Sequence, residues 1–146
     1  MNILVKATGA LLIVFSGAVA GIAGAADDAA DIRALIGREF DRPGAAVVSD
    51  PIVSEREFAL ADWVQGEKGG RALLRKKDGR WAIMLCAGDE IREAGGMVKA
   101  GVPQPIASAL ASRLASAESN LPASQVKMFG RFGAEKRTHD GHTGHR

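Results

Sequence analysis

The chain has 146 residues, a formal charge of +2, 47% hydrophobic residues, one cysteine and no tyrosine. This length suits one folded domain with one core and is too short for two. The near-neutral charge argues against nucleic acid as a partner, which needs a basic face, and a single cysteine excludes an internal disulfide.

Residues 1–25 have the pattern of a secretory signal peptide. Lys6 is followed by an apolar run, and Ala23-Gly24-Ala25 offers a small-x-small cleavage site. The apolar run is short for a spanning helix and ends at small residues instead of a basic stop. We therefore expect an exported protein without a stable membrane span after cleavage, with a single domain over residues 26–132.

The first predicted element of this domain is a helix from Asp28 to Phe40, because apolar residues recur there at steps of three and four. Two short β-prone pieces follow, Ala45 to Ser49 and Ile52 to Ser54, split by Asp50-Pro51. Pro51 has no amide hydrogen to give to a ladder, so an edge strand is expected here.

The stretch from Phe58 to Gly88 predicts three consecutive antiparallel strands, with turns at Gly66 to Gly70 and at Asp78-Gly79. Alternation in the last strand would place Cys86 on the face opposite Trp81. Basic residues of the second hairpin are expected to form a solvated face: Arg71, Arg75, Lys76, Lys77 and Arg80.

Beyond the hairpins, Asp89 to Ala100 predicts a short helix broken at Gly95-Gly96. The main C-terminal helix follows two prolines and carries one apolar stripe, made of Ile106, Leu110, Leu114, Ala117 and Leu121. Gln125 to Phe132 alternates like a closing strand, and residues 133–146 should form a disordered, histidine-containing tail.

Together these elements predict an α+β fold: an N-terminal helix, an antiparallel sheet of about four to five strands, and a C-terminal helix packed on the sheet. This layout also resembles cystatin-like and NTF2-like folds, which commonly hold ligands between helix and sheet.

The tail contains all three histidines of the protein, His139, His142 and His145, at steps of three residues. Imidazole is a good ligand for Cu(II), Ni(II) and Zn(II), and the intervening glycines let the chain fold its rings around one ion. The alternative is a solvated tail without a metal role.

Cys86 is a second candidate metal ligand, because a thiolate suits Cu(I) and Met84 lies two residues earlier on the same strand. The competing interpretation is a small buried side chain beside a packing methionine. A third outcome is a disulfide-linked dimer through Cys86.

Several segments in order resemble one family. They are Asp50-Pro51, Ala61-Asp62-Trp63, Gln65-Gly66, Gly69-Gly70-Arg71-Ala72-Leu73-Leu74, Asp78-Gly79 before Trp81, Leu85-Cys86-x-Gly88-Asp89, Ala100-Gly101-Val102-Pro103, the alanine-rich helix carrying Glu118, and Phe129 to Phe132. The combination is similar to the copper uptake system-associated proteins, which are small exported bacterial proteins.

The resemblance implies a periplasmic accessory of copper uptake, with copper as its ligand and components of a copper import system as partners. It carries over no catalytic residues, and the sequence contains no nucleophile elbow, zincin motif, phosphate loop or Cys-x-x-Cys. We therefore expect no enzyme activity. The alternative is a protein-interaction or small-ligand module of cystatin-like or NTF2-like shape, with no metal role.

Overall fold

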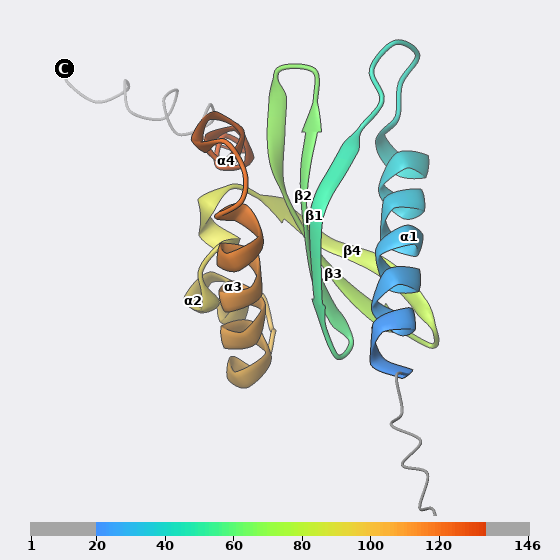
Figure 1. The fold of residues 1–146 in the computed structure, drawn as a ribbon, viewed down its shortest axis with the longest axis vertical. Helices are drawn as coiled ribbons and strands as arrows, with labels where there is room; N and C mark the ends of the chain where they lie inside the picture. The colour runs from blue at the N-terminus through green and yellow to red at the C-terminus, as the bar shows by residue number, and fades with distance from the viewer. Residues whose placement is uncertain (1–19, 134–146) are drawn as a thin grey trace, which may run out of the picture.

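The computed structural model describes residues 20–133, and side chains from residue 24 onward. It is an α+β fold, as predicted, with a four-stranded antiparallel sheet in the order β1-β2-β3-β4 between two helical layers (Figure 1). The elements in chain order are α1 (Ala20–Phe40), β1 (Val48–Glu55), β2 (Phe58–Gln65), β3 (Lys68–Lys77), β4 (Arg80–Ala87), the 3-10 turn η1 (Asp89–Ile91), α2 (Ala94–Lys99), α3 (Gln104–Glu118) and α4 (Ala123–Phe129).

The central meander confirms the three predicted antiparallel strands. Asp78 and Gly79 have φ angles of +51° and +74°, the left-handed pair that a two-residue hairpin turn requires. The first turn is shorter than expected, because Gly69 and Gly70 already belong to β3. β1 lies at the edge of the sheet, as Pro51 predicts.

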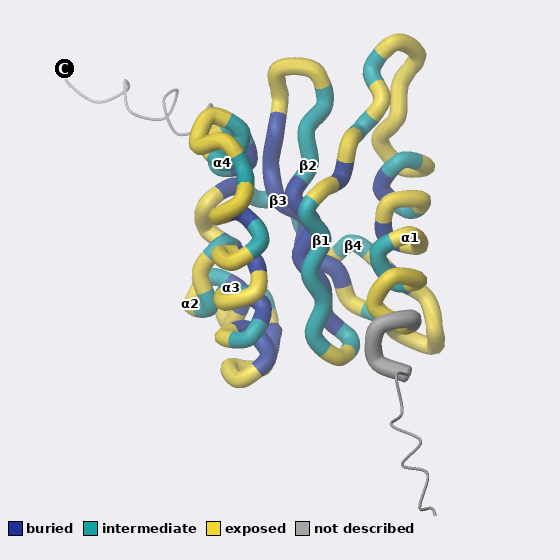
Figure 2. Tube along the Cα trace, viewed as in Figure 1, coloured by how far each residue is buried: buried dark blue, intermediate teal, exposed yellow. Residues whose placement is uncertain are grey.

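The sheet has a separate apolar core on each face (Figure 2). The first core, which we call the α1 core, consists of the predicted apolar stripe of α1 and the residues of the meander that face this helix, including Ile32, Ile36, Leu74 and Trp81. The other core joins α2 and α3 to the opposite face, including Leu60, Leu73, Met97, Leu110 and Leu114. Each helical layer therefore buries its own face of one shared sheet.

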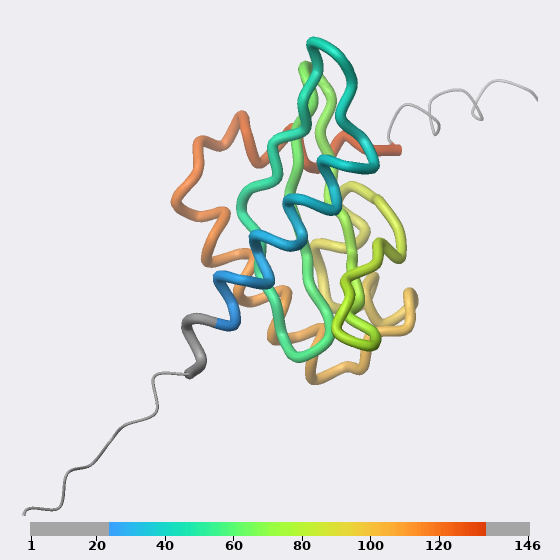
Figure 3. Tube along the Cα trace, turned by 90° about the vertical axis from the view of Figure 1, so that its right-hand side faces the viewer, coloured from blue at the N-terminus to red at the C-terminus, as the bar shows by residue number. Residues whose placement is uncertain are grey.

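α1 crosses the sheet obliquely (Figure 3) and is tied to it by one carboxylate. Asp28 Oδ1 accepts hydrogen bonds from Lys76 Nζ at 2.6 Å and Trp81 Nε1 at 3.1 Å. The hydrogen bond that Lys76 donates to Asp28 raises the pKa of Lys76 above its ordinary value. Lys76 is thus not one of the freely solvated charges of the predicted basic hairpin, whereas Arg75, Lys77 and Arg80 are exposed.

The face assignment within β4 was wrong for Cys86. The β3–β4 register pairs Leu73 with Leu85 but Leu74 with Ile83, so β4 contains one extra residue, a β-bulge. Such an insertion reverses the alternation beyond it. Cys86 consequently packs against the α1 core together with Trp81 and Ile83, while Leu85 packs in the opposite core.

Two further predictions need correction, one for a helix and one for a strand. α1 is described from Ala20, earlier than the predicted start at Asp28. The expected closing strand from Gln125 to Phe132 is mostly the helix α4, in which Phe129 is fully buried. A segment this short fits both periods, and a helix that starts after Pro122 buries one side chain while its other residues stay near the surface.

Gly96 lies against the backbone before α2, because a Cβ there would stand 1.5 Å from the carbonyl oxygen of Glu90. We expect Gly96→Ala to lower the free energy of unfolding by about 3 kcal/mol, since the backbone would have to move. Gly95→Ala is the matched control. Its Cβ would meet nothing within 4 Å, so alanine should be neutral or stabilise by up to about 1 kcal/mol. Urea unfolding would measure both variants, and equal destabilisation by the two would contradict this packing.

Candidate functional site

The most unusual feature of the interior is a cluster of charged side chains on the face of β2 and β3 that α2 and α3 cover. Arg71 and Asp62 are 0% exposed and Glu118 is 2% exposed. The β2–β3 register places Asp62 directly opposite Arg71. Glu118 follows Leu114 and Leu110 at four-residue steps, so it continues the buried stripe of α3.

The Arg71 guanidinium is the centre of this buried charge cluster. Its Nη2 and Nε donate to Glu118 Oε1 at 2.6 and 3.1 Å, and its Nη1 donates to Asp89 Oδ1 at 3.0 Å. The ring of Phe129 lies 5.8 Å from the Arg71 Cζ. Arg92 Nε completes the group by donating to Glu118 Oε2 at 2.8 Å. The sheet, α3, α4 and the η1 segment therefore meet at one side chain.

Asp62 differs from the other carboxyl groups of the cluster. Its Oδ1 lies 3.2 Å from Arg71 Nε, but neither carboxyl oxygen receives a hydrogen bond from a described residue. Burial raises the pKa of Asp62 to about 8, Arg71 opposes the rise, and the Glu118 carboxylate adds to it through its charge and a hydrogen bond. A pKa of about 8 favours the protonated form of Asp62 at neutral pH, in which its hydroxyl can donate to Glu118.

With Asp62 neutral, the charges of the cluster balance. Arg71 and Arg92 carry two positive charges, and Glu118 and Asp89 carry two negative ones. Paired carboxyl groups also occur in acid–base catalysis. Here the pair is enclosed, and only Asp89 and Arg92 reach the surface, with side chains 75% and 40% exposed. The arrangement therefore joins the sheet to the C-terminal helices through buried charges.

The sequence prediction missed this cluster, and the solvated position expected for Arg71 was wrong. Two signals were present. Arg71 stands between two glycines and the apolar residues Ala72 to Leu74, and Glu118 lies on the apolar stripe of its helix. Each is a charge in an apolar pattern, which indicates a buried partner.

The sulfur residues predicted as copper ligands do not form a multi-donor site. Cys86 is half-buried and packs against the α1 core, and burial raises the pKa of its thiol, which disfavours the thiolate that copper binds. Met84 lies at the β4 bulge and is 38% exposed. No group of three or more His, Cys, Asp or Glu side chains within residues 24–133 could hold a metal ion. The predicted ligands His139, His142 and His145 lie outside the described residues.

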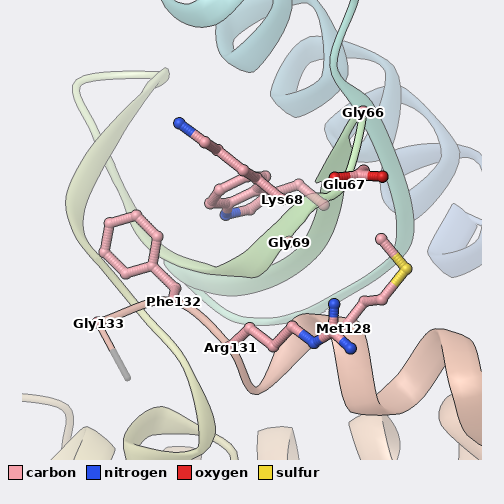
Figure 4. A pocket seen from close by; sticks show the side chains of 9 residues that line it. Gly66, Glu67, Lys68, Gly69, Met128, Arg131, Phe132 and Gly133 are labelled. Atoms are coloured by element: carbon pink, nitrogen blue, oxygen red, sulfur yellow. The ribbon is translucent and has the colours of Figure 1, made fainter. Parts of the chain in front are cut away.

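An open pocket of about 860 Å³ lies where the β2–β3 hairpin meets the chain that follows α4. We call it the Trp63 pocket, and its principal residues are Trp63, Lys68, Gly69, Met128, Arg131 and Phe132. The Trp63 and Phe132 rings meet edge to face, with centroids 5.6 Å apart. Figure 4 shows the Phe132 ring on one side, Met128 on the other, and the Arg131 side chain extending between them.

No family model, curated protein or solved structure matches the chain. In the part of the chain that the structure describes, no helix combines the length and apolar character needed to cross a membrane.

We expect Arg71→Met to lower the free energy of unfolding by about 3–5 kcal/mol, because it would leave the buried carboxyl groups without their cation. Arg75→Met is the matched control on the same strand. Arg75 is exposed and lies over the Phe58 ring at 5.4 Å, so its loss should cost less than about 1 kcal/mol. Urea unfolding would compare them, and a loss of similar size for both would show that the cluster has no special role.

The raised pKa of Asp62 predicts a pH dependence of stability. Between the unfolded value of 3.8 and the folded value of about 8, the folded chain keeps a proton that the unfolded chain has lost. The free energy of unfolding contributed by this group should therefore fall as pH rises through that range, by up to about 1.4 kcal/mol per pH unit. Asp62→Asn cannot ionise, so its stability should depend less on pH. Denaturation of both proteins from pH 5 to 9 would test this, and parallel curves would exclude a protonated Asp62.

Proposed function

We propose that this protein is a periplasmic accessory of copper uptake, which binds copper ions and hands them on without catalysing a reaction. The observation that carries the proposal is the spacing of His139, His142 and His145 in a chain that resembles the copper uptake system-associated proteins. Three imidazoles at short, glycine-separated steps suit Cu(II). The partners would be components of a copper import system.

Several of the segments that carry the resemblance also hold the fold together. The segments that carry it supply four of the five members of the buried charge cluster, namely Asp62, Arg71, Asp89 and Glu118. These residues hold the sheet and the C-terminal helices together. The resemblance therefore includes residues that maintain the architecture, and the proposed Cu(II) ligands His139, His142 and His145 lie outside the segments that carry it.

The donor types determine which copper oxidation state each proposed site would bind. Cys86 has a raised thiol pKa and a half-buried position, so we assign Cu(II) capture to the histidines and treat Cys86, with Met84, as at most a secondary Cu(I) site. Gly133, the first residue of the expected tail, lines the Trp63 pocket. The folded domain would then serve as the support from which the histidine segment is presented.

Two observations favour the alternative of a small-ligand or interaction module without a metal role. The Trp63 pocket has the volume of a ligand site, and Cys86 packs in an apolar core. Half-burial of Cys86 also disfavours a dimer linked through its sulfur. Copper binding is the property that separates the two functions.

The decisive measurement is a copper titration of the full chain against a His139→Ala/His142→Ala/His145→Ala variant, with Cu(II) and, under reducing conditions, with Cu(I). We expect Cu(II) binding to be lost in the histidine variant and kept in Cys86→Ser. Thr138→Ala/Thr143→Ala controls for changes in the same segment that remove no ligand. Unchanged Cu(II) binding after loss of all three histidines, or no copper binding by the parent chain, would overturn the proposed function.

A further inference from the structure

We propose that the Trp63 pocket binds a small organic anion with a flat apolar body, an aryl carboxylate being the simplest example. The inference is independent of copper, because it uses none of the histidines and neither Cys86 nor Met84 lines this pocket. It rests on the pocket walls, on the charges at its mouth and on one buried donor.

The walls suit a flat apolar body. Trp63 and Phe132 meet edge to face at an interplanar angle of 74°, and Met128 adds a polarisable thioether to the lining. Phe132 is 40% exposed, so its ring has free surface for a further aromatic partner. Aromatic pairs of this geometry contribute beyond the area they bury, and a volume of about 860 Å³ lies within the range of small-molecule sites.

The charges at the mouth select for an anion. Lys68 and Arg131 both line the pocket and are exposed, and neither forms an ion pair with another described residue. Glu67 is the one acidic residue in the lining. Unpaired cations beside an apolar wall suit a ligand that carries a carboxylate on an aromatic ring system, because arginine can donate hydrogen bonds to both carboxylate oxygens.

Trp63 supplies the third observation. Its indole Nε1 is buried and finds no acceptor among the described residues. A buried donor without a partner is unfavourable, and Trp63 itself lines the pocket. An oxygen of a bound carboxylate that enters beside Phe132 would satisfy this donor. Both side chains lie close to Gly70, where an added Cβ would stand 2.7 Å from the Trp63 ring and 2.8 Å from the Cβ of Phe132.

The pocket is held open by the architecture around it. A Cβ on Gly69 would stand 2.7 Å from the Met128 carbonyl oxygen, so β3 and α4 are in close backbone contact on one side of the pocket. The next residue of α4, Phe129, packs over Arg71 of the buried charge cluster. These contacts hold the end of α4 against the sheet, directly before the residues Arg131 and Phe132 that line the pocket.

The test is a titration of the full chain with phenylacetate, in which the indole N–H signal of a proton–nitrogen NMR spectrum reports binding. Trp81→Phe leaves Trp63 as the one tryptophan, so the indole signal reports this pocket alone. Phenylacetamide is the neutral ligand of the same shape. A chelator keeps the sample free of metal, so the result does not depend on the copper proposal. We expect a saturable shift with phenylacetate and a much weaker one with phenylacetamide.

Two variants separate charge from packing. Lys68→Gln/Arg131→Gln should weaken phenylacetate binding about tenfold, whereas Arg80→Gln/Lys127→Gln removes the same charge from exposed sites outside the pocket and should leave binding unchanged. Phe132→Ala should weaken both ligands. Equal binding by the two double variants, equal binding of acid and amide, or an indole signal that does not move would each overturn the proposal.

Discussion

The buried guanidinium of Arg71 is the constraint on which the C-terminal half of the fold depends. A cation removed from water must be paired, and Arg71 finds carboxylates from the end of α3 and from the η1 segment, with the Phe129 ring of α4 beside it. Apolar residues in the same places could match the stability of such a group, but they would not demand one particular arrangement. The cluster therefore contributes specificity of packing more than net free energy.

The same constraint positions the Trp63 pocket. Phe129 contacts Arg71 from α4, and two residues further on the chain supplies Arg131 and Phe132 to the pocket lining. A change that loosens the cluster would therefore shift Arg131 and Phe132 in the pocket lining, although no member of the cluster lines the pocket. Among the described residues, the proposed copper ligands Cys86 and Met84 belong neither to the cluster nor to the pocket lining.

Patterns of local origin were predictable from the sequence. The Asp78-Gly79 turn, the edge position of β1 beside Pro51 and the apolar stripe of α3 all depend on neighbours within a few residues. Arg71 and Glu118, in contrast, are 47 positions apart. A charged residue considered without its distant partner is predicted to lie at the protein surface. The bulge in β4 leaves no mark in composition, and α4 is short enough for its apolar spacing to fit a strand. Those features arise from tertiary packing, which overrides local periodicity.

The β4 bulge also affects what lies beyond the sheet. Both outer strands are irregular, since β1 carries Pro51 and a register shift between Ser49 and Ile52, and β4 carries the extra residue near Met84. A regular outer strand presents a row of unpaired amide and carbonyl groups that can recruit another chain, and proline and bulges interrupt that row. The two interruptions therefore discourage edge-to-edge aggregation, so the open sheet can remain exposed at its margins without becoming a template for fibre growth.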